Sequence, residues 1–502
     1  MTNQQKWKKL AKHLEEIKVY YRSIGKLNFD MECCAPEEGI PAAGRDMAIL
    51  GRQVHKLTHA KAFERLIEEL HADSEGLTSV QKKAVEHLYD NYARSKNISA
   101  ALSFEMDSAT AKAYGDWLSA KKASDFSLFR DSLETLIRHT RQAIDLRDEH
   151  PEGYYNSCLD DMEKGGSEQQ LDAFFNALKA RIVPLIKRIQ AEGRPIREDF
   201  MSRPVPVQQQ EAMSRYLLEL EGLRKSALVL MTTEHPFTTN FGRQDVRVTT
   251  HYHEDRFIAN VFTSLHEGGH ALFMQNEPVE LHENYCDNSM SIAMHETISR
   301  FYENIIGRSE AFVSFITPKI KELACGTFDD ISERELYEAV NIVKPGLLRT
   351  EADELSYSLH ILIRYELEKA FINGEIGVDE IPALWNAKYK EYLGVDVPDD
   401  ASGCLQDVHW SGISFGYFPS YALGNAYGAQ IMHAMRQDFD VDAAVSAGEL
   451  FKVRDWLTEH VFSIASLTTP DEWIRSISGE SLNVNYYLDY LEKKYGAIYG
   501  LN

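Results

Sequence analysis

The chain has 502 residues, 44% hydrophobic and 26% charged, which is typical of a globular protein with an extensive core and room for more than one lobe. Its 77 acidic and 54 basic residues give a formal net charge of −23, which argues against nucleic acid or an anionic membrane as the main partner. The sequence has no apolar run of membrane-spanning length, its first 21 residues do not resemble a signal peptide, and its six cysteines form no disulfide framework, so we expect a cytoplasmic protein.

The first 230 residues predict a series of amphipathic helices. In the first of them, Leu10, Leu14, Ile17 and Tyr21 recur at helical spacing. Short polar or Gly/Pro-containing segments separate one apolar pattern from the next. The expected helices cover residues 8–21, 60–70, 78–95, 109–120, 127–146, 169–192 and 208–230.

Residues 238–253 break this helical pattern. Alternation and β-branched side chains, strongest in residues 245–250, predict a hairpin or short edge strands. An exposed edge strand can hold an extended peptide through main-chain hydrogen bonds. Helical character resumes near Asp255 and continues to the end, with an interruption at residues 394–403.

His266, Glu267 and His270 lie in this next predicted helix with the spacing of an H-E-x-x-H motif. Residues four apart project from the same helix face, so both imidazoles can bind one Zn²⁺ ion. Glu267 lies beside them, where its carboxylate can polarise a zinc-bound water and accept its proton. A pattern this short also arises by chance, so a third metal ligand elsewhere in the sequence would strengthen the prediction of a zinc site.

The third ligand is expected to be a carboxylate from a following helix. The extended motif with a later Gly and a third His is absent, because Phe273 and Asn276 occupy those positions. We choose Glu296, since it lies in the apolar residues 291–306, where a buried charge needs a counter-ion such as zinc. With Glu296 as ligand, Glu303 is expected to orient a ligand histidine from outside. The acidic candidates considered were Glu277, Glu280, Glu283, Glu296 and Glu303.

The H-E-x-x-H segment belongs to an ordered series of motifs between about residue 235 and residue 424. They are His235-Pro236-Phe237, Asp245-Val246-Arg247-Val248-Thr249, His266-Glu267-Gly268-Gly269-His270, His295-Glu296-Thr297, Phe301-Tyr302-Glu303-Asn304, Arg349-Thr350-Glu351-Ala352-Asp353 and Gly403-Cys404-Leu405-Gln406-Asp407-Val408-His409-Trp410. Together they resemble the carboxypeptidase Taq family of zinc metallocarboxypeptidases. One departure is Thr297, where many members have Ser; the exchange keeps the hydroxyl group.

The resemblance implies a mainly α fold: an elongated helical metallopeptidase with a deep substrate groove and a small β-ribbon near the zinc site, similar to angiotensin-converting enzyme and neurolysin. We expect a single peptidase domain over residues 1–502, in which residues 1–230 form a helical lobe and one groove wall and residues 231–502 form the zinc-binding catalytic lobe. The resemblance also implies a homodimer that releases single amino acids from peptides with a free C-terminus, with broad preference and proline disfavoured.

The family's zinc ligands map onto His266, His270 and Glu296, and its general base maps onto Glu267. Each subunit is expected to hold one Zn²⁺ ion, which Co²⁺ can replace. The same zinc site would also serve an endopeptidase or a peptidyl-dipeptidase. A further alternative is an inactive peptide-binding scaffold, against which the intact Glu267 and both histidines argue.

A carboxypeptidase must recognise a terminal carboxylate, and the planar guanidinium of arginine suits that task. Arg349 is the preferred anchor, with Arg247 and Arg364 as alternatives. The competing interpretation is a structural ion pair, for instance Arg247 with Asp245 or Arg349 with Asp353.

Neutral donors near the metal can stabilise the oxyanion of a tetrahedral intermediate. His409, Tyr417 and Tyr421 are the candidates, because related helical peptidases use a His followed by a Tyr in a similar Gly/Tyr-rich stretch. The competing interpretation for these aromatic residues is core packing. His235 is expected to shape the wall or floor of the groove.

Overall fold

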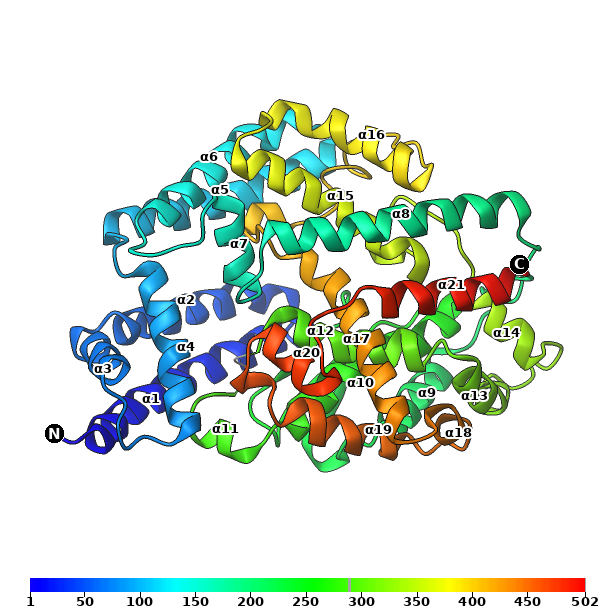
Figure 1. Cartoon of the computed structure of the whole chain (residues 1–502), viewed down its shortest axis with the longest axis horizontal. Helices are drawn as coiled ribbons and strands as arrows, with labels where there is room; N and C mark the ends of the chain where they lie inside the picture. Colours follow the sequence, from blue (N-terminus) through cyan, green and yellow to red (C-terminus); the bar gives the residue numbers. More distant parts are fainter. Residues whose placement is uncertain (288–289, 502) are drawn as a thin grey trace.

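The computed structural model describes residues 1–287 and 290–501, and the chain is mainly α-helical, as the sequence predicts (Figure 1). The helices up to residue 220 are α1 (Asn3–Cys33), α2 (Ile40–Thr58), α3 (Lys61–Ala72), α4 (Ser79–Ser95), α5 (Ala100–Ala123), α6 (Ser127–Asp145), α7 (Tyr154–Met162), α8 (Glu168–Glu192) and α9 (Val207–Leu220). In Figure 1, α1–α4 lie together at the end that holds the N-terminus, and α5 and α6 lie above them.

The rest of the chain adds a small sheet and the remaining helices. These elements are β1 (Leu228–Thr232), β2 (Thr238–Asn240), β3 (Val246–Thr250), α10 (Phe257–Asn276), α11 (Val279–Glu283), α12 (Ile292–Arg300), α13 (Glu310–Leu323), α14 (Glu333–Ala339), α15 (Glu354–Asn373), α16 (Ile381–Leu393), α17 (Phe418–Asp438), α18 (Val441–Ser446), α19 (Leu450–Leu457), α20 (Pro470–Ser478) and α21 (Asn485–Tyr499). α8 and α21 run side by side across the middle of the molecule, below α15 and α16 (Figure 1).

The sheet has the strand order β1-β3-β2, so β3 is its central strand. β3 pairs antiparallel with β2, with Thr238 opposite Val248, which confirms the hairpin expected within residues 238–253. β3 also pairs parallel with β1, with Leu228 opposite Val246, and packs against α10. The sheet therefore lies directly beside the helix that carries the His266 motif.

The helix expected over residues 208–230 is wrong beyond Leu220, where α9 ends. Gly222 follows with φ +93°, a left-handed conformation that stops a helix and that glycine adopts without a steric penalty. The following apolar run then forms β1 instead of more helix. The pairing with β3 that stabilises this strand is non-local, and helical periodicity in a single segment does not reveal it.

The other expected helices are confirmed, and α1 and α5 extend well beyond their predicted bounds. α1 begins at a capping box between Thr2 and Gln5 and extends to Cys33. Ser291 caps α12 by accepting a hydrogen bond from the Met294 N–H, and a π-helical segment, Phe301–Ile306, continues α12.

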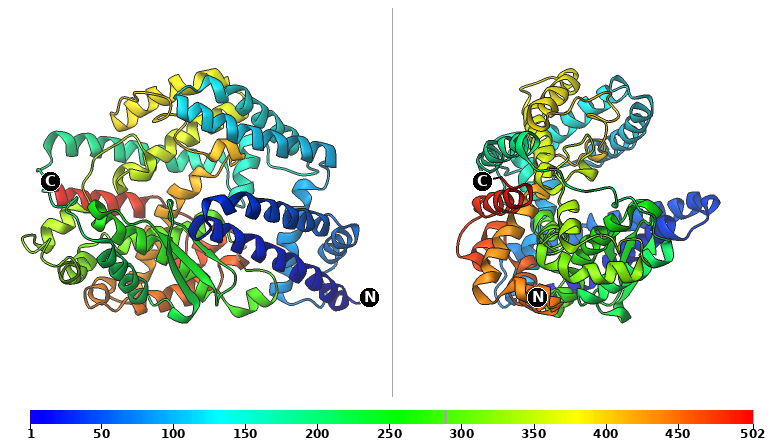
Figure 2. Two further views of the ribbon diagram at one scale, coloured as in Figure 1. Left: turned by 180° about the vertical axis from the view of Figure 1, so that it is seen from behind. Right: turned by 90° about the vertical axis from the view of Figure 1, so that its right-hand side faces the viewer.

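Among the described residues, two hydrophobic clusters form the core of the fold. The larger one takes side chains from Ala113 to Tyr499, on both sides of residue 230, so the division into lobes at that residue stays a prediction. The smaller one joins α1–α4 to Leu281 and Cys286. The end of α1 also packs on the sheet (Figure 2), where the Phe29 and Phe237 rings meet edge-on with centroids 6.0 Å apart. No helix in the described part of the chain is long and apolar enough to cross a membrane.

Candidate metal centre

The two glycines of the His266 motif allow α10 to make very close contacts. A Cβ atom at Gly269 would lie 2.8 Å from the backbone of Ile298 and Ser299, so α10 and α12 touch backbone to backbone at this point. A Cβ atom at Gly268 would collide with the buried carboxyl group of Glu221. The close crossing of α10 and α12 brings the residues of α12 next to the histidines of α10.

The structure brings His266, His270 and Glu296 together, with ligand atoms that all lie within 4.8 Å of one another. His270 Nε2 is 3.5 Å from Glu296 Oε2. On the other side of α12, a Cβ at Gly424 of α17 would lie only 3.2 Å from Glu296 Cγ, so α17 supports this side chain. Two imidazoles and one carboxylate, with a further coordination position open to water, are the donor set of a catalytic zinc site.

Both histidines are held by partners on their other ring nitrogen. His266 Nδ1 is 2.9 Å from Glu303 Oε2, which places Glu303 in the supporting position expected from the sequence. His270 Nδ1 is 2.7 Å from His295 Nδ1. In the tautomer that leaves the His270 Nε2 lone pair free, His270 Nδ1–H donates to His295. Partners of this kind fix the ring orientation and the tautomer of a metal-binding histidine.

Arg300, which the sequence did not single out, lies between Glu296 and Glu303. Its Nε donates to Glu296 Oε1 at 2.9 Å, and its Nη1 lies 3.3 Å from Glu303 Oε2. Its guanidinium lies over the Tyr357 ring, 4.2 Å from the centroid. In the sequence, Arg300 is indicated only by its position four residues after Glu296, about one helical turn away, where a Glu and an Arg can pair.

The sheet reaches the centre through Thr238 of β2. Its hydroxyl donates to Glu267 Oε2 at 2.6 Å and is 3.0 Å from the Glu267 carbonyl oxygen. Burial raises the pKa of Glu267, while His266 and the Thr238 hydroxyl oppose that shift. Glu267 is therefore a carboxylate with increased proton affinity, fixed in orientation by the sheet.

The charges around His266 are strongly coupled. Burial lowers the pKa of His266, but Glu296 and Glu303 outweigh it and raise that pKa to about 8. Burial raises the pKa of Glu303, but Arg300 and His266 outweigh it and lower that pKa to about 2. Burial, together with the neighbouring His295, lowers the pKa of His270 well below its ordinary value. Glu303 thus stays ionised at neutral pH and can support His266 as a permanent acceptor.

The structure also brings His409, Tyr417 and Tyr421 together, at the start of α17. The Tyr421 hydroxyl is 3.5 Å from His409 Nε2, and the Tyr417 and Tyr421 ring centroids are 5.3 Å apart. Burial lowers the pKa of His409 to about 4 and raises that of Tyr421. At neutral pH, all three side chains are thus uncharged groups able to donate hydrogen bonds. The Glu296 carboxylate also contributes to the raised pKa of both tyrosines, so both hydroxyls lie within electrostatic range of it.

Arg349 lies beside these donors, 4.9 Å from the Tyr421 ring centroid. It is largely buried, and its Nη2 is 2.9 Å from Asp407 Oδ1. Arg364 is fully buried and binds the other oxygen of Asp407 at 2.7 Å. Arg349 therefore forms a structural ion pair, as the competing interpretation expected, but with Asp407 as its partner. Asp353 instead caps α15 and accepts from the Ser356 N–H.

Arg247 and His235 lie on the sheet side of the molecule. Arg247 pairs with Asp245 at 2.9 Å, as the structural alternative proposed, and its guanidinium lies 4.9 Å and 4.8 Å from the Phe29 and Phe241 ring centroids. His235 is exposed in the segment between β1 and β2.

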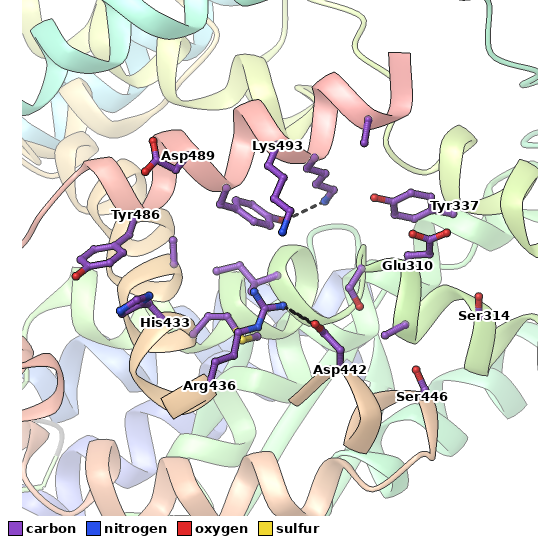
Figure 3. A pocket seen from close by; sticks show the side chains of 18 residues that line it. Glu310, Ser314, Tyr337, His433, Arg436, Asp442, Ser446, Tyr486, Asp489 and Lys493 are labelled. Carbon is purple, nitrogen blue, oxygen red and sulfur yellow. Dashed lines mark hydrogen bonds and ion pairs between the residues drawn. The ribbon is translucent and has the colours of Figure 1, made fainter. Parts of the chain in front are cut away.

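A cavity of about 840 Å³ lies elsewhere, between α13, α17 and α21 (Figure 3). Tyr337, His433 and Lys493 line it, together with Arg436 and Asp442, which are paired at 2.9 Å. None of the candidate site residues named above belongs to its lining in the described structure. The cavity therefore shares no described lining residue with the candidate metal centre.

Several known proteins resemble this chain in sequence and in overall fold. A sequence model of the carboxypeptidase Taq (M32) metallopeptidases matches residues 9–495. The chain is 38% identical over 489 residues to Carboxypeptidase 1 of Bacillus subtilis (strain 168), covering 97% of each protein. It is 33% identical over 498 residues to Thermostable carboxypeptidase 1 of Thermus thermophilus, covering 96% of this chain and 97% of that protein. Among solved structures, the M32 carboxypeptidase from Deinococcus radiodurans R1 matches with a TM-score of 0.95 and 29% identity, covering 99% of this chain and 100% of that chain.

Proposed function

Because the chain belongs to the carboxypeptidase Taq (M32) family of metallopeptidases, we propose that it is a zinc-dependent carboxypeptidase that releases single amino acids from the C-terminus of peptides. Family membership makes it a metal-dependent peptide hydrolase of the carboxypeptidase type. The convergence of His266, His270 and Glu296 is the observation that carries the choice of zinc, since this donor set suits it.

The side chains around this centre have complementary tasks. When bound, a zinc ion would supply Lewis-acid polarisation of a water molecule and of the peptide carbonyl. Glu267 takes the proton of the water and passes it to the leaving amine, and burial has raised its proton affinity for that task. Thr238 holds the Glu267 carboxylate in place. Tyr421, Tyr417 and His409 donate hydrogen bonds to the developing oxyanion.

Arg349 is the proposed anchor for the terminal carboxylate of the peptide. Its support is its place beside Tyr421, with a guanidinium that Asp407 already orients. Arg247 stays an alternative on the strand side, and His235 is proposed to shape the groove wall. An extended peptide would lie along the edge strand β2, next to Glu267.

Further properties are proposed from the family resemblance alone. They are a deep groove similar to that of angiotensin-converting enzyme and neurolysin, a homodimer, a cytoplasmic location, replacement of Zn²⁺ by Co²⁺, and broad preference with proline disfavoured.

The deciding experiment uses a peptide with a free C-terminus and its C-terminally amidated twin, with zinc or cobalt restored to the protein. Mass spectrometry should detect sequential loss of single residues from the free peptide only. Equal cleavage of the amidated peptide would identify an endopeptidase, and release of dipeptides would identify a peptidyl-dipeptidase. Glu267→Gln should abolish turnover and retain zinc, whereas Glu296→Ala should lose zinc. Full activity of Glu267→Gln would refute the proton-transfer role.

A further inference from the structure

A buried carboxyl group far from the metal motifs in sequence joins three helices behind the centre. Glu163 directly follows α7, which stands between the upper and lower groups of helices in Figure 1. Its side chain is buried, and its Oε1 accepts from the Ala293 N–H at 2.7 Å and from the Ser420 hydroxyl at 2.8 Å. These two partners belong to α12 and α17.

The contact with Ala293 is at the first turn of the helix that carries Glu296. N–H groups of a first turn have no acceptor within their own helix, and a carboxylate there also interacts favourably with the helix dipole. Ser291 satisfies the Met294 N–H, and Glu163 satisfies that of Ala293. Glu296 follows Ala293 by three residues, so the position of the first turn sets where its carboxylate points.

The contact with Ser420 lies on the opposite side of the same junction. Ser420 directly precedes Tyr421, and the next turn of α17 brings Gly424 against Glu296. A single carboxyl oxygen therefore accepts a hydrogen bond from each of α12 and α17, near the place where the two helices enclose the third candidate ligand.

α7 itself is firmly held, so it can serve as a fixed support. A Cβ at Gly416 would lie 2.7 Å from the Cys158 carbonyl oxygen, which shows that the segment before α17 touches the α7 backbone. On α15, the buried Glu368 accepts from the Tyr155 hydroxyl of α7 at 2.9 Å. The contacts that hold α7 thus involve none of the candidate metal ligands.

We propose that Glu163 is a positioning residue for the metal centre: through its bond to the Ala293 N–H it fixes the first turn of α12, so that the Glu296 carboxylate faces His266 and His270. The inference rests on the proposed zinc-binding function. Burial raises the pKa of Glu163 to about 7, and the hydrogen bonds from Ser291, Ala293 and Ser420 oppose that shift. Since the Glu163 carboxyl exists in both protonation states near neutral pH, we expect its positioning role to depend on an acceptor oxygen and not on a negative charge. A glutamine can supply that oxygen.

Three variants of this residue test the proposal. Glu163→Gln keeps the length and the acceptor, Glu163→Met keeps the length without an acceptor, and Glu163→Asp keeps the carboxylate but shortens its reach. Ser420→Ala is the matched control, because it removes the α17 bond and leaves the α12 bond. The measurements are the zinc dissociation constant by competition with a chromophoric chelator, the absorption spectrum of the cobalt-loaded protein, and kcat and KM.

The expected result is a loss of zinc affinity of about tenfold or more in Glu163→Met, the range seen when a partner of a metal ligand is removed, with an altered cobalt spectrum and lower kcat. Glu163→Gln should restore all three readouts to within about threefold of wild type, and Ser420→Ala should bind zinc normally. If Glu163→Met does not fold, Glu163→Asp decides, with weaker zinc binding than Glu163→Gln.

Wild-type zinc affinity and cobalt spectrum in Glu163→Met or Glu163→Asp would overturn the proposal, as would a Glu163→Gln variant as defective as Glu163→Met. Equal weakening of zinc binding by Ser420→Ala would also overturn it. Failure of the wild-type protein itself to bind zinc would instead refute the proposed function, so the two failures are distinguishable.

Discussion

Replacing Gly269 with alanine puts a methyl group into the backbone contact between α10 and α12. The new Cβ would lie 2.8 Å from Ile298 O and from Ser299 Cα, and neither backbone atom can rotate away. The helices must therefore separate by several tenths of an ångström, and overpacking of this kind costs about 1–3 kcal/mol. Alanine returns about 1 kcal/mol through its better helix propensity. The expected net destabilisation is therefore up to about 2 kcal/mol.

Gly115, inside α5, provides the matched control, because a Cβ there has no atom within 4 Å. Gly115→Ala should gain the helix propensity alone and raise stability by about 1 kcal/mol. Thermal unfolding of both variants, scanned beside wild type, should therefore give midpoints shifted in opposite directions. Zinc affinity should fall about tenfold or more in Gly269→Ala only, because α12 carries Glu296 away from the histidines. Equal stabilisation in both variants, with unchanged zinc binding, would refute the role assigned to this contact.

The other predictions concern single side chains. His295→Ala should weaken zinc binding about 10- to 100-fold by removing the partner of His270, while the exposed His433→Ala should bind zinc like wild type in the same chelator competition. Glu163 has a pKa raised by burial from 4.5 to about 7, so the native protein holds this proton more tightly than the unfolded chain and loses stability as pH rises from about 4.5 to 7. Denaturant titrations from pH 5 to 8 should therefore show the free energy of unfolding of Glu163→Gln rising relative to that of wild type, by up to about 3 kcal/mol. A difference in unfolding free energy that does not change with pH would contradict a buried acid at this position. Arg349→Lys should raise KM for peptides with a free C-terminus about tenfold, since an ammonium group lacks the planar fork; a fall in kcat alone would argue against an anchor.

Local geometry explains why the centre could be predicted from the sequence. Two histidines four residues apart on a helix must share a face, and a glutamate inside an apolar helix needs a positive partner. The structure places His266, His270 and Glu296 together as those arguments expected, and Glu303 next to His266. Both inferences depend on residues close together in the sequence.

What the sequence did not reveal depends on residues far apart in the chain. β1 forms because β3 is available to pair with it, and no property of residues 228–232 alone indicates that partner. Arg349 pairs with Asp407, 58 residues away in the sequence, and not with the nearby Asp353. Glu163 meets α12 across 130 residues. Such contacts follow from the tertiary arrangement, which periodicity and motif spacing do not encode.

The support that α7 gives to α12 limits how this centre can be transferred between proteins. A gene segment for residues 231–502 would encode every proposed metal ligand and the proposed base, and it would still lack the oxygen that holds the Ala293 N–H. It would also lack the backbone of Cys158, on which Gly416 rests. Recombination that exchanges residues 1–230 or residues 231–502 would therefore have to preserve the contacts of α7 with α12 and with the segment before α17. The candidate metal centre therefore depends on both parts of the chain and is not a detachable module.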